Sequence, residues 1–178
     1  MRRPHDLRLG PSTRLIVLIV FGVAFGFVEA AVVYDLRNLL GFHAHVPIPH
    51  YHSVLNLGFI NFVTAKKSLL VTRELTRVET VREVCTIVML GAVALLSTRT
   101  WLGRLGAFLV GFSCWDLAYY GFLRVIDHWP QSLMTRDVFF LIPVMWIGPV
   151  ITPLVIFTLL LLLGAWLVLR LDEPWTLE

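Results

Sequence analysis

Carboxylate residues interrupt or border three apolar segments of this chain, and they are the side chains best able to do chemistry. Glu29 and Asp116 lie within the apolar segments 15–34 and 105–123, and Glu83 stands immediately before a third. A carboxylate inside hydrocarbon costs several kcal/mol unless it is paired, protonated or bound to a metal. These three residues are therefore the first candidates for a functional site.

Carboxylates from several helices, together with imidazole, form the ligand sets of iron and manganese sites in helix bundles. A fourth carboxylate lies one helical turn before Glu83, and four histidines are concentrated between the first two segments. These residues do not identify the metal, and the Glu-x-x-His signature of di-iron bundles is absent. The histidines alone could hold zinc or copper, or could simply be solvated. The candidate ligands are Glu29, Glu79, Glu83, Asp116, His43, His45, His50 and His52.

A structural role is the alternative for the same polar residues. Glu79 and Glu83 share one helical face and repel each other unless a cation lies between them. Arg82 or a metal could be that cation. In the structural alternative Arg82 pairs with Glu83 or Asp116. The candidate polar network comprises Arg82, Tyr119, Tyr120 and Arg124, with Glu29 either neutral or hydrogen-bonded to Tyr120.

The composition is that of an integral membrane protein. Hydrophobic residues make up 57% of the 178 residues and charged residues 15%, against about 25% charged residues in ordinary soluble domains. The net charge of +3 comes largely from arginines near the N-terminus, so we expect the lipid bilayer as a partner and no nucleic acid. The chain has no nucleophile triad, phosphate-binding loop, dinucleotide fingerprint or His-Glu-x-x-His motif, so enzymatic activity stays open.

We predict an all-α fold, a polytopic bundle of transmembrane helices that forms one domain over residues 1–178. The uncharged run 138–169 is too long for one straight span, and Pro143, Pro149 and Pro153 supply a break. The predicted elements are four spans at about 15–34, 76–98, 103–124 and 150–169, a half-helix at about 137–146, and an interfacial loop at 35–72.

The first span has a distinctive face. Gly22, Gly26 and Glu29 follow one another at four- and three-residue spacing, which places them on the same side of a helix. Small residues at this spacing let a second helix approach closely. We therefore expect Glu29 to point into a seam between helices.

The topology decides whether the carboxylates meet. With the Arg-rich N-terminus in the cytoplasm, four spans place the candidate carboxylates and Asp137 in the outer third of the cell membrane, below the histidine loop. A fifth span at 46–65 would separate them, and the distribution of Lys and Arg favours that alternative. Pro47 and Pro49, with the polar residues that follow, make 46–65 a poor span.

Five blocks of the chain, at 27–33, 82–90, 112–120, 129–133 and 139–144, form a pattern whose most specific part is Trp-Asp-x-x-Tyr-Tyr at 115–120. Together these blocks resemble an uncharacterised family of small bacterial polytopic membrane proteins. The resemblance implies no span between the first segment and the Arg-Glu block, in agreement with four spans. It implies no activity, and the histidine-dense loop looks particular to this chain.

The sequence thus predicts an integral membrane protein with a buried acidic cluster near the outer leaflet that binds a metal or another cation. The alternative is a non-enzymatic structural, assembly or transport subunit in which the cluster serves helix packing. Either protein could act as a homo-oligomer or within a larger membrane complex.

Overall fold

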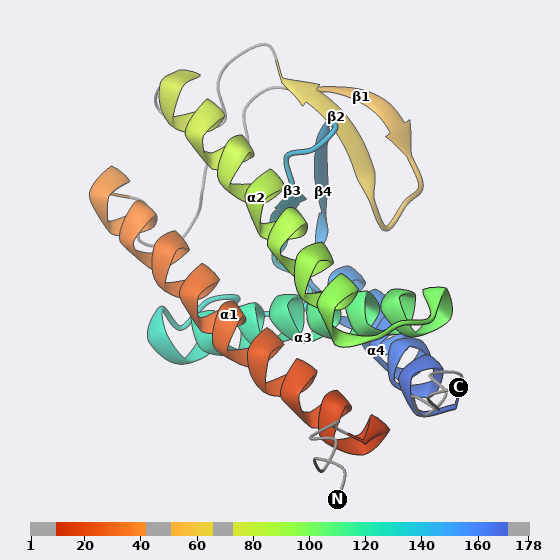
Figure 1. Ribbon diagram of the computed structural model, residues 1–178. Helices are drawn as coiled ribbons and strands as arrows, with labels where there is room; N and C mark the ends of the chain where they lie inside the picture. The colour runs from red at the N-terminus through yellow and green to blue at the C-terminus, as the bar shows by residue number, and fades with distance from the viewer. Residues whose placement is uncertain (1–9, 42–50, 66–72, 171–178) are drawn as a thin grey trace, which may run out of the picture.

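Four helices and a small sheet make up the part of the chain that the structure describes (Figure 1). The structure is a computed structural model, and it describes residues 10–41, 51–65 and 73–170. The helices are α1 (Pro11–Leu40), α2 (Arg73–Ser97), α3 (Trp101–Ile126) and α4 (Ile151–Arg170), and the strands are β1 (Tyr51–Asn56), β2 (Asn61–Ala65), β3 (Arg136–Phe140) and β4 (Met145–Pro149).

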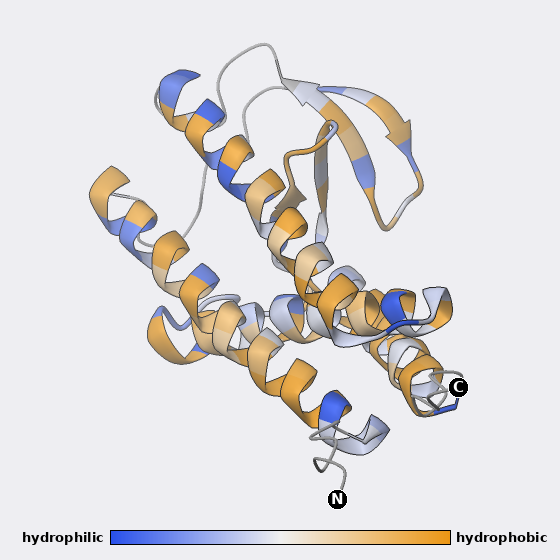
Figure 2. Ribbon diagram, in the orientation of Figure 1, coloured by the Kyte–Doolittle hydropathy of each residue, from blue (hydrophilic) through white to orange (hydrophobic). Residues whose placement is uncertain are grey.

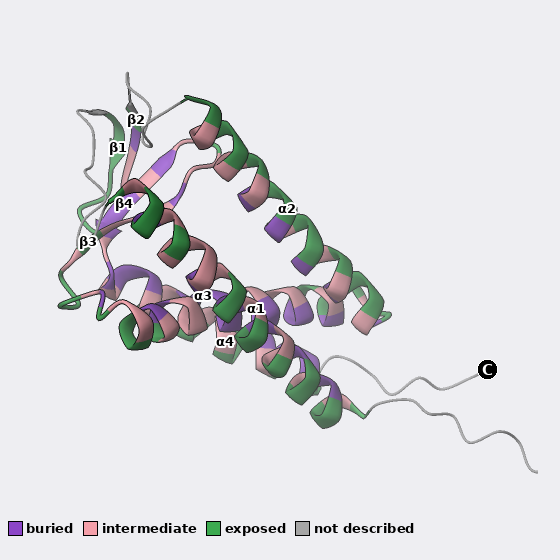
Figure 3. Cartoon of the chain, turned by 90° about the vertical axis from the view of Figure 1, so that its left-hand side faces the viewer, coloured by how far each residue is buried: buried purple, intermediate pink, exposed green. Residues whose placement is uncertain are grey.

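Among these residues, α1, α2 and α4 are each long and apolar enough to cross a membrane. Only 22% of the residues in the apolar windows of α1 and α2, and 33% in that of α4, are buried within the protein. The helices therefore expose apolar faces, which Figures 2 and 3 show along their outer sides. The prediction of a mainly helical protein is confirmed, and the three candidate spans agree with a location in a membrane. Helix α3, which carries Asp116, Tyr119 and Tyr120, is not among the three.

Helix α3 is the centre of the fold, because α1, α2 and α4 all pack against it. Gly22 and Gly26 of α1 lie so close to α3 that a Cβ atom on Gly26 would stand 2.6 Å from the carbonyl oxygen of Trp115. The predicted close approach at this glycine face is therefore confirmed. Gly106 and Gly164 make an equally close contact between α3 and α4.

A four-stranded antiparallel sheet covers one end of the helices, in the order β1-β2-β4-β3. The all-α prediction is wrong on this point. The predicted half-helix at 137–146 is also wrong, because 136–149 forms the β3–β4 hairpin. The prediction failed for two reasons. Pro143 interrupts a strand as readily as a helix, so it does not distinguish the two. The strand β4 also pairs with β2, which lies far away in the sequence and could not be recognised as its partner.

The described parts of the predicted interfacial loop at 35–72 are helix and strand. Helix α1 continues six residues beyond 34 and ends at Gly41, whose φ of 72° gives the left-handed cap that glycine adopts readily. Residues 51–65 form the β1–β2 hairpin, which excludes a helical fifth span there. Because β2 pairs with β4, the α1–α2 and α3–α4 connections meet at the same end of the helices.

Candidate functional site: a buried carboxyl cluster

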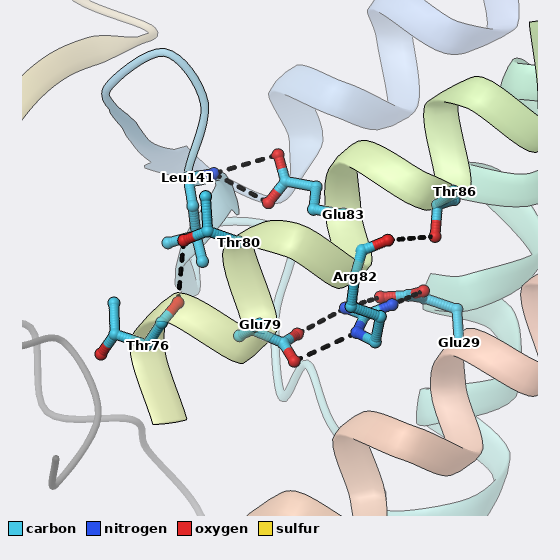
Figure 4. A network of polar contacts seen from close by, with 8 residues as sticks. All are labelled: Glu29, Thr76, Glu79, Thr80, Arg82, Glu83, Thr86 and Leu141. Carbon is cyan, nitrogen blue, oxygen red and sulfur yellow. Dashed lines mark hydrogen bonds and ion pairs between the residues drawn. The ribbon is translucent and has the colours of Figure 1, made fainter. Parts of the chain in front are cut away.

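Arg82 of α2 is held between two carboxylates (Figure 4). Its Nη2 atom donates to Glu29 Oε1 at 2.7 Å, and its Nη1 atom also contacts the Glu29 carboxylate. On the other side, Nε donates to Glu79 Oε2 at 3.1 Å, and Nη2 bonds Glu79 Oε1. The Arg82 side chain is 27% exposed, and its partners less so. Arg82 is thus the cation of the cluster, paired with Glu29 and Glu79 and not with Glu83 or Asp116 as we expected.

This ion pair links two helices that otherwise hardly touch, because α1 and α2 each pack mainly on α3. Glu29 reaches the seam because Gly22 and Gly26 bring its face of α1 close to the rest of the bundle. A guanidinium that bonds two carboxylates through paired N–H groups also fixes their relative orientation. The Glu29–Arg82–Glu79 contact therefore sets the position of α2 beside α1.

Glu83 lies one turn beyond Glu79 but faces the sheet. Both of its carboxylate oxygens accept hydrogen bonds from the backbone N–H of Leu141, at 3.0 and 3.2 Å. The residue is buried. Leu141 directly follows β3, so Glu83 ties α2 to the β3–β4 hairpin through backbone hydrogen bonds. The expected repulsion between Glu79 and Glu83 is relieved because the two side chains turn to opposite partners.

Asp116 lies in the middle of α3 and is 5% exposed. Its Oδ2 atom has no hydrogen-bond partner among the residues that the structure describes. The neighbouring Trp115 packs into an aromatic group, 5.5 Å from the Phe112 ring and 6.3 Å from that of Phe140. Asp137 and Glu29 are the charged groups that act on Asp116, and both are themselves acidic. Asp116 thus carries a buried carboxyl that no cation among the described residues pairs with.

Asp137 of β3 accepts a hydrogen bond from the Tyr120 hydroxyl at 2.9 Å. The structural alternative supposed a hydrogen bond between Tyr120 and Glu29, but the Tyr120 hydroxyl donates to Asp137 instead. The ring of Tyr119 packs against that of Tyr120, with 4.9 Å between the ring centroids. Burial raises the pKa of Asp137 to about 6, although the Tyr120 bond and the charge of Arg37 act in the opposite direction. Asp137 can therefore bind or release a proton near neutral pH.

Arg37 of α1 is buried, and the sequence patterns did not point to it. Arg37 Nη1 pairs with Asp127 Oδ2 at 2.8 Å, and the guanidinium lies 4.1 Å from the ring centroid of Trp129. Trp129 in turn stacks on Tyr120, at 6.1 Å between ring centroids. Arg37 lies eight residues after Glu29 and therefore on the same side of α1. This spacing could have identified Arg37 only if the helix had been predicted to continue beyond Tyr34, where the predicted span ended.

The predicted metal site is not assembled by the described residues, which contain no group of three His, Cys, Asp or Glu residues able to hold a metal ion. Two predicted ligands are paired with Arg82, and Glu83 is bonded to the backbone. His52 is exposed in β1, and Arg124 donates instead to the backbone oxygens of His128 and Pro130. The predicted ligands His43, His45 and His50 lie outside the described residues.

Comparisons with known proteins add no assignment to this geometry. No protein-family model, curated protein or solved structure matches the chain. The resemblance carried by the Trp-Asp-x-x-Tyr-Tyr block stays a prediction. The function is therefore argued from the carboxyl cluster, by which we mean Glu29, Glu79, Glu83, Asp116 and Asp137.

Proposed function

We propose that this is a multi-pass protein of the cell membrane that binds and releases protons at its carboxyl cluster. It acts as a transport or coupling subunit of a homo-oligomer or larger membrane complex and not as an enzyme. The observation that carries the proposal is Asp116, a buried carboxyl whose Oδ2 atom lacks a partner among the described residues.

The topology that supports this function has four spans, with α3 as the central one. The pairing of β2 with β4 favours this topology, because it brings the α1–α2 and α3–α4 connections to the same side of the membrane. The chain between these two connections must then cross the membrane an even number of times, as α2 and α3 do. The Arg-rich N-terminus belongs in the cytoplasm by the positive-inside rule, which puts the sheet on the outer side. The carboxyl cluster then lies near the outer leaflet.

The balance of charge in the cluster favours a bound proton. Arg82 neutralises Glu29 and Glu79, while Glu83 and Asp137 receive hydrogen bonds only from uncharged donors among the described residues. Buried carboxylates without a cation are costly, and they avoid that cost by taking up protons. Chains of carboxyl and hydroxyl groups in membrane helices typically serve as proton relays. Asp116, Asp137 and Tyr120 provide such groups within one region of the fold.

The remaining polar contacts support the structural alternative for part of the cluster. Glu29, Arg82 and Glu79 satisfy one another and join α1 to α2, so their role is to position the helices. A metal centre is less favoured, because three of its four predicted carboxylate ligands, Glu29, Glu79 and Glu83, already have other partners. Metal binding by the histidine-dense loop stays a prediction.

Infrared difference spectroscopy on the protein in lipid bilayers tests the proton directly. At neutral pH we expect the carbonyl band of a protonated carboxylic acid, and we expect Asp116→Asn to remove part of it. Asp127→Asn is the matched control, because Asp127 is paired with Arg37 and lies outside the carboxyl cluster. A spectrum without any protonated carboxyl would refute the proposal.

Proton flux into liposomes tests the function itself. Under an imposed membrane potential, the wild type should acidify the lumen faster than Asp116→Asn, which should match empty liposomes. Elemental analysis of protein purified without chelator completes the comparison. If the wild type holds a stoichiometric metal and both Glu83→Gln and Asp116→Asn lose it, the carboxyl cluster binds a metal and the proposal of proton binding is refuted.

A further inference from the structure

The turn of the β1–β2 hairpin is an apolar surface outside the helices. Val54, Leu55, Leu57 and Phe59 expose between 47% and 63% of their surface, and they lie within six consecutive residues. No Asp, Glu, Lys or Arg occurs anywhere in 51–65. A contiguous exposed patch of this kind marks a contact with lipid or with another protein.

Several polar groups near the turn have partners within the hairpin. Asn56 Oδ1 accepts from the backbone N–H of Gly58 at 2.8 Å, and the backbone N–H of Leu57 donates to the carbonyl oxygen of Ile60 at 2.9 Å. Ser53 Oγ donates to Asn61 Oδ1 at 2.6 Å. Transfer of a backbone polar group out of water is costly unless it has an internal partner. These internal hydrogen bonds reduce the cost of moving the turn from water into an apolar environment.

The structure also fixes the depth of the turn relative to the helices. Thr152, in the first turn of α4, donates its hydroxyl to the carbonyl oxygen of Phe59 at 3.1 Å. Gly148, at the end of β4, lies so close that an added Cβ atom would stand 2.5 Å from the same oxygen. Helix α4 begins at Ile151 and carries no charged residue before Arg170. The turn is thus held level with the start of an apolar, membrane-length helix, and Figure 1 shows it pointing back toward the helices.

We propose that the tip of the β1–β2 hairpin, residues 54–59, inserts into the interfacial layer of the bilayer beside α4. Lipid is favoured as the occupant because the patch continues the lipid-facing side of that helix. Val155 and Leu159 follow Thr152 at three- and seven-residue spacing, share its side of the helix, and are 50% and 61% exposed. The inference rests on the membrane location of α4 and is independent of proton binding.

Spin-label accessibility in lipid bilayers tests the insertion. A nitroxide is attached to Leu57→Cys in a chain that carries Cys85→Ala and Cys114→Ala. Thr64→Cys is the matched control, because Thr64 is exposed in β2 at the other end of the same hairpin. We expect the label at 57 to collide preferentially with oxygen, which concentrates in the bilayer. The label at 64 should collide preferentially with a water-soluble nickel complex. Val54→Cys provides a second position in the patch, with the same expectation as Leu57→Cys.

Two results would overturn the proposal. Equal access of the nickel complex to the labels at 57 and 64 would place the tip in water. Loss of collisions with both reagents at 57 would place it against protein instead of lipid. Failure of the infrared or flux experiments would leave this test unaffected.

Discussion

Replacing Gly26 by alanine is expected to push α1 away from α3 and to destabilise the protein. The added methyl group would stand 2.6 Å from the carbonyl oxygen of Trp115, 2.7 Å from Cβ of Ala118 and 3.0 Å from the backbone nitrogen of Tyr119. Two of these three atoms belong to the α3 backbone and cannot rotate away. Relief of the clash therefore requires a movement of the helices themselves.

The size of the effect follows from these distances. Carbon atoms in contact normally lie about 3.5–4.0 Å apart, so the helices must separate by about 1 Å at this point. Overpacking of this kind costs about 1–3 kcal/mol, and the rigid backbone opposite Gly26 places the cost in the upper part of that range. Glu29 follows one turn later in α1 and would also be drawn away from Arg82.

Gly121→Ala provides the matched control in α3. Gly121 is exposed and has no heavy atom within 4 Å of an added Cβ atom, so alanine should be neutral or stabilise the helix by up to about 1 kcal/mol. Unfolding of both variants in mild detergent micelles, followed by circular dichroism during titration with sodium dodecyl sulfate, measures the difference. If Gly26→Ala and Gly121→Ala unfold at the same concentration of sodium dodecyl sulfate, the close packing of α1 on α3 is refuted.

Three further predictions concern the buried polar groups. The pKa of Asp137 is raised from its ordinary 3.8 to about 6, mainly by burial. The folded state therefore binds this proton more tightly, and stability should fall by up to about 3 kcal/mol as pH rises from about 4 to about 6. Asp137→Asn should remove that component of a pH series of unfolding curves, and a series identical to the wild type would contradict the assignment. Tyr120→Phe deletes a hydrogen bond that lowers this pKa, so the pH dependence should extend to higher pH, and an unchanged series would exclude the contact. Arg37→Lys should lower stability by about 1–2 kcal/mol, because a lysine ammonium cannot both stack on Trp129 and reproduce the pairing with Asp127; wild-type stability would refute this.

The helices and one seam were predictable because their determinants are local. Apolar runs of membrane length identify α1, α2 and α4, and the spacing of Gly22, Gly26 and Glu29 was enough to place that face of α1 against another helix. The clustering of acidic residues in otherwise apolar segments also identified Glu29, Glu83 and Asp116 as candidates for one region of the fold. Each of these patterns involves residues within a few positions of one another on the same helix, so the helical periodicity is enough to recognise it.

The sheet and the pairing of the charges depend on contacts between distant segments. Residues 137–146 form strands because β4 finds β2, and that partner could not be inferred from the proline and aromatic residues of the segment itself. Arg82 had several carboxylates within reach along the sequence, and only the placement of α1 beside α2 selected Glu29 and Glu79. Glu83 was likewise free to bind a metal or a cation until the β3–β4 hairpin presented the backbone N–H of Leu141.

The sequence by itself determined that the chain is built for a membrane and which of its carboxylates are costly to bury. The tertiary structure decided which of them are neutralised. A local pattern states that a carboxylate lies in an apolar segment, but the partner comes from whichever distant group the packing brings within about 3 Å. For Glu29 and Glu79 that group is the Arg82 guanidinium, whereas Oδ2 of Asp116 has none among the described residues.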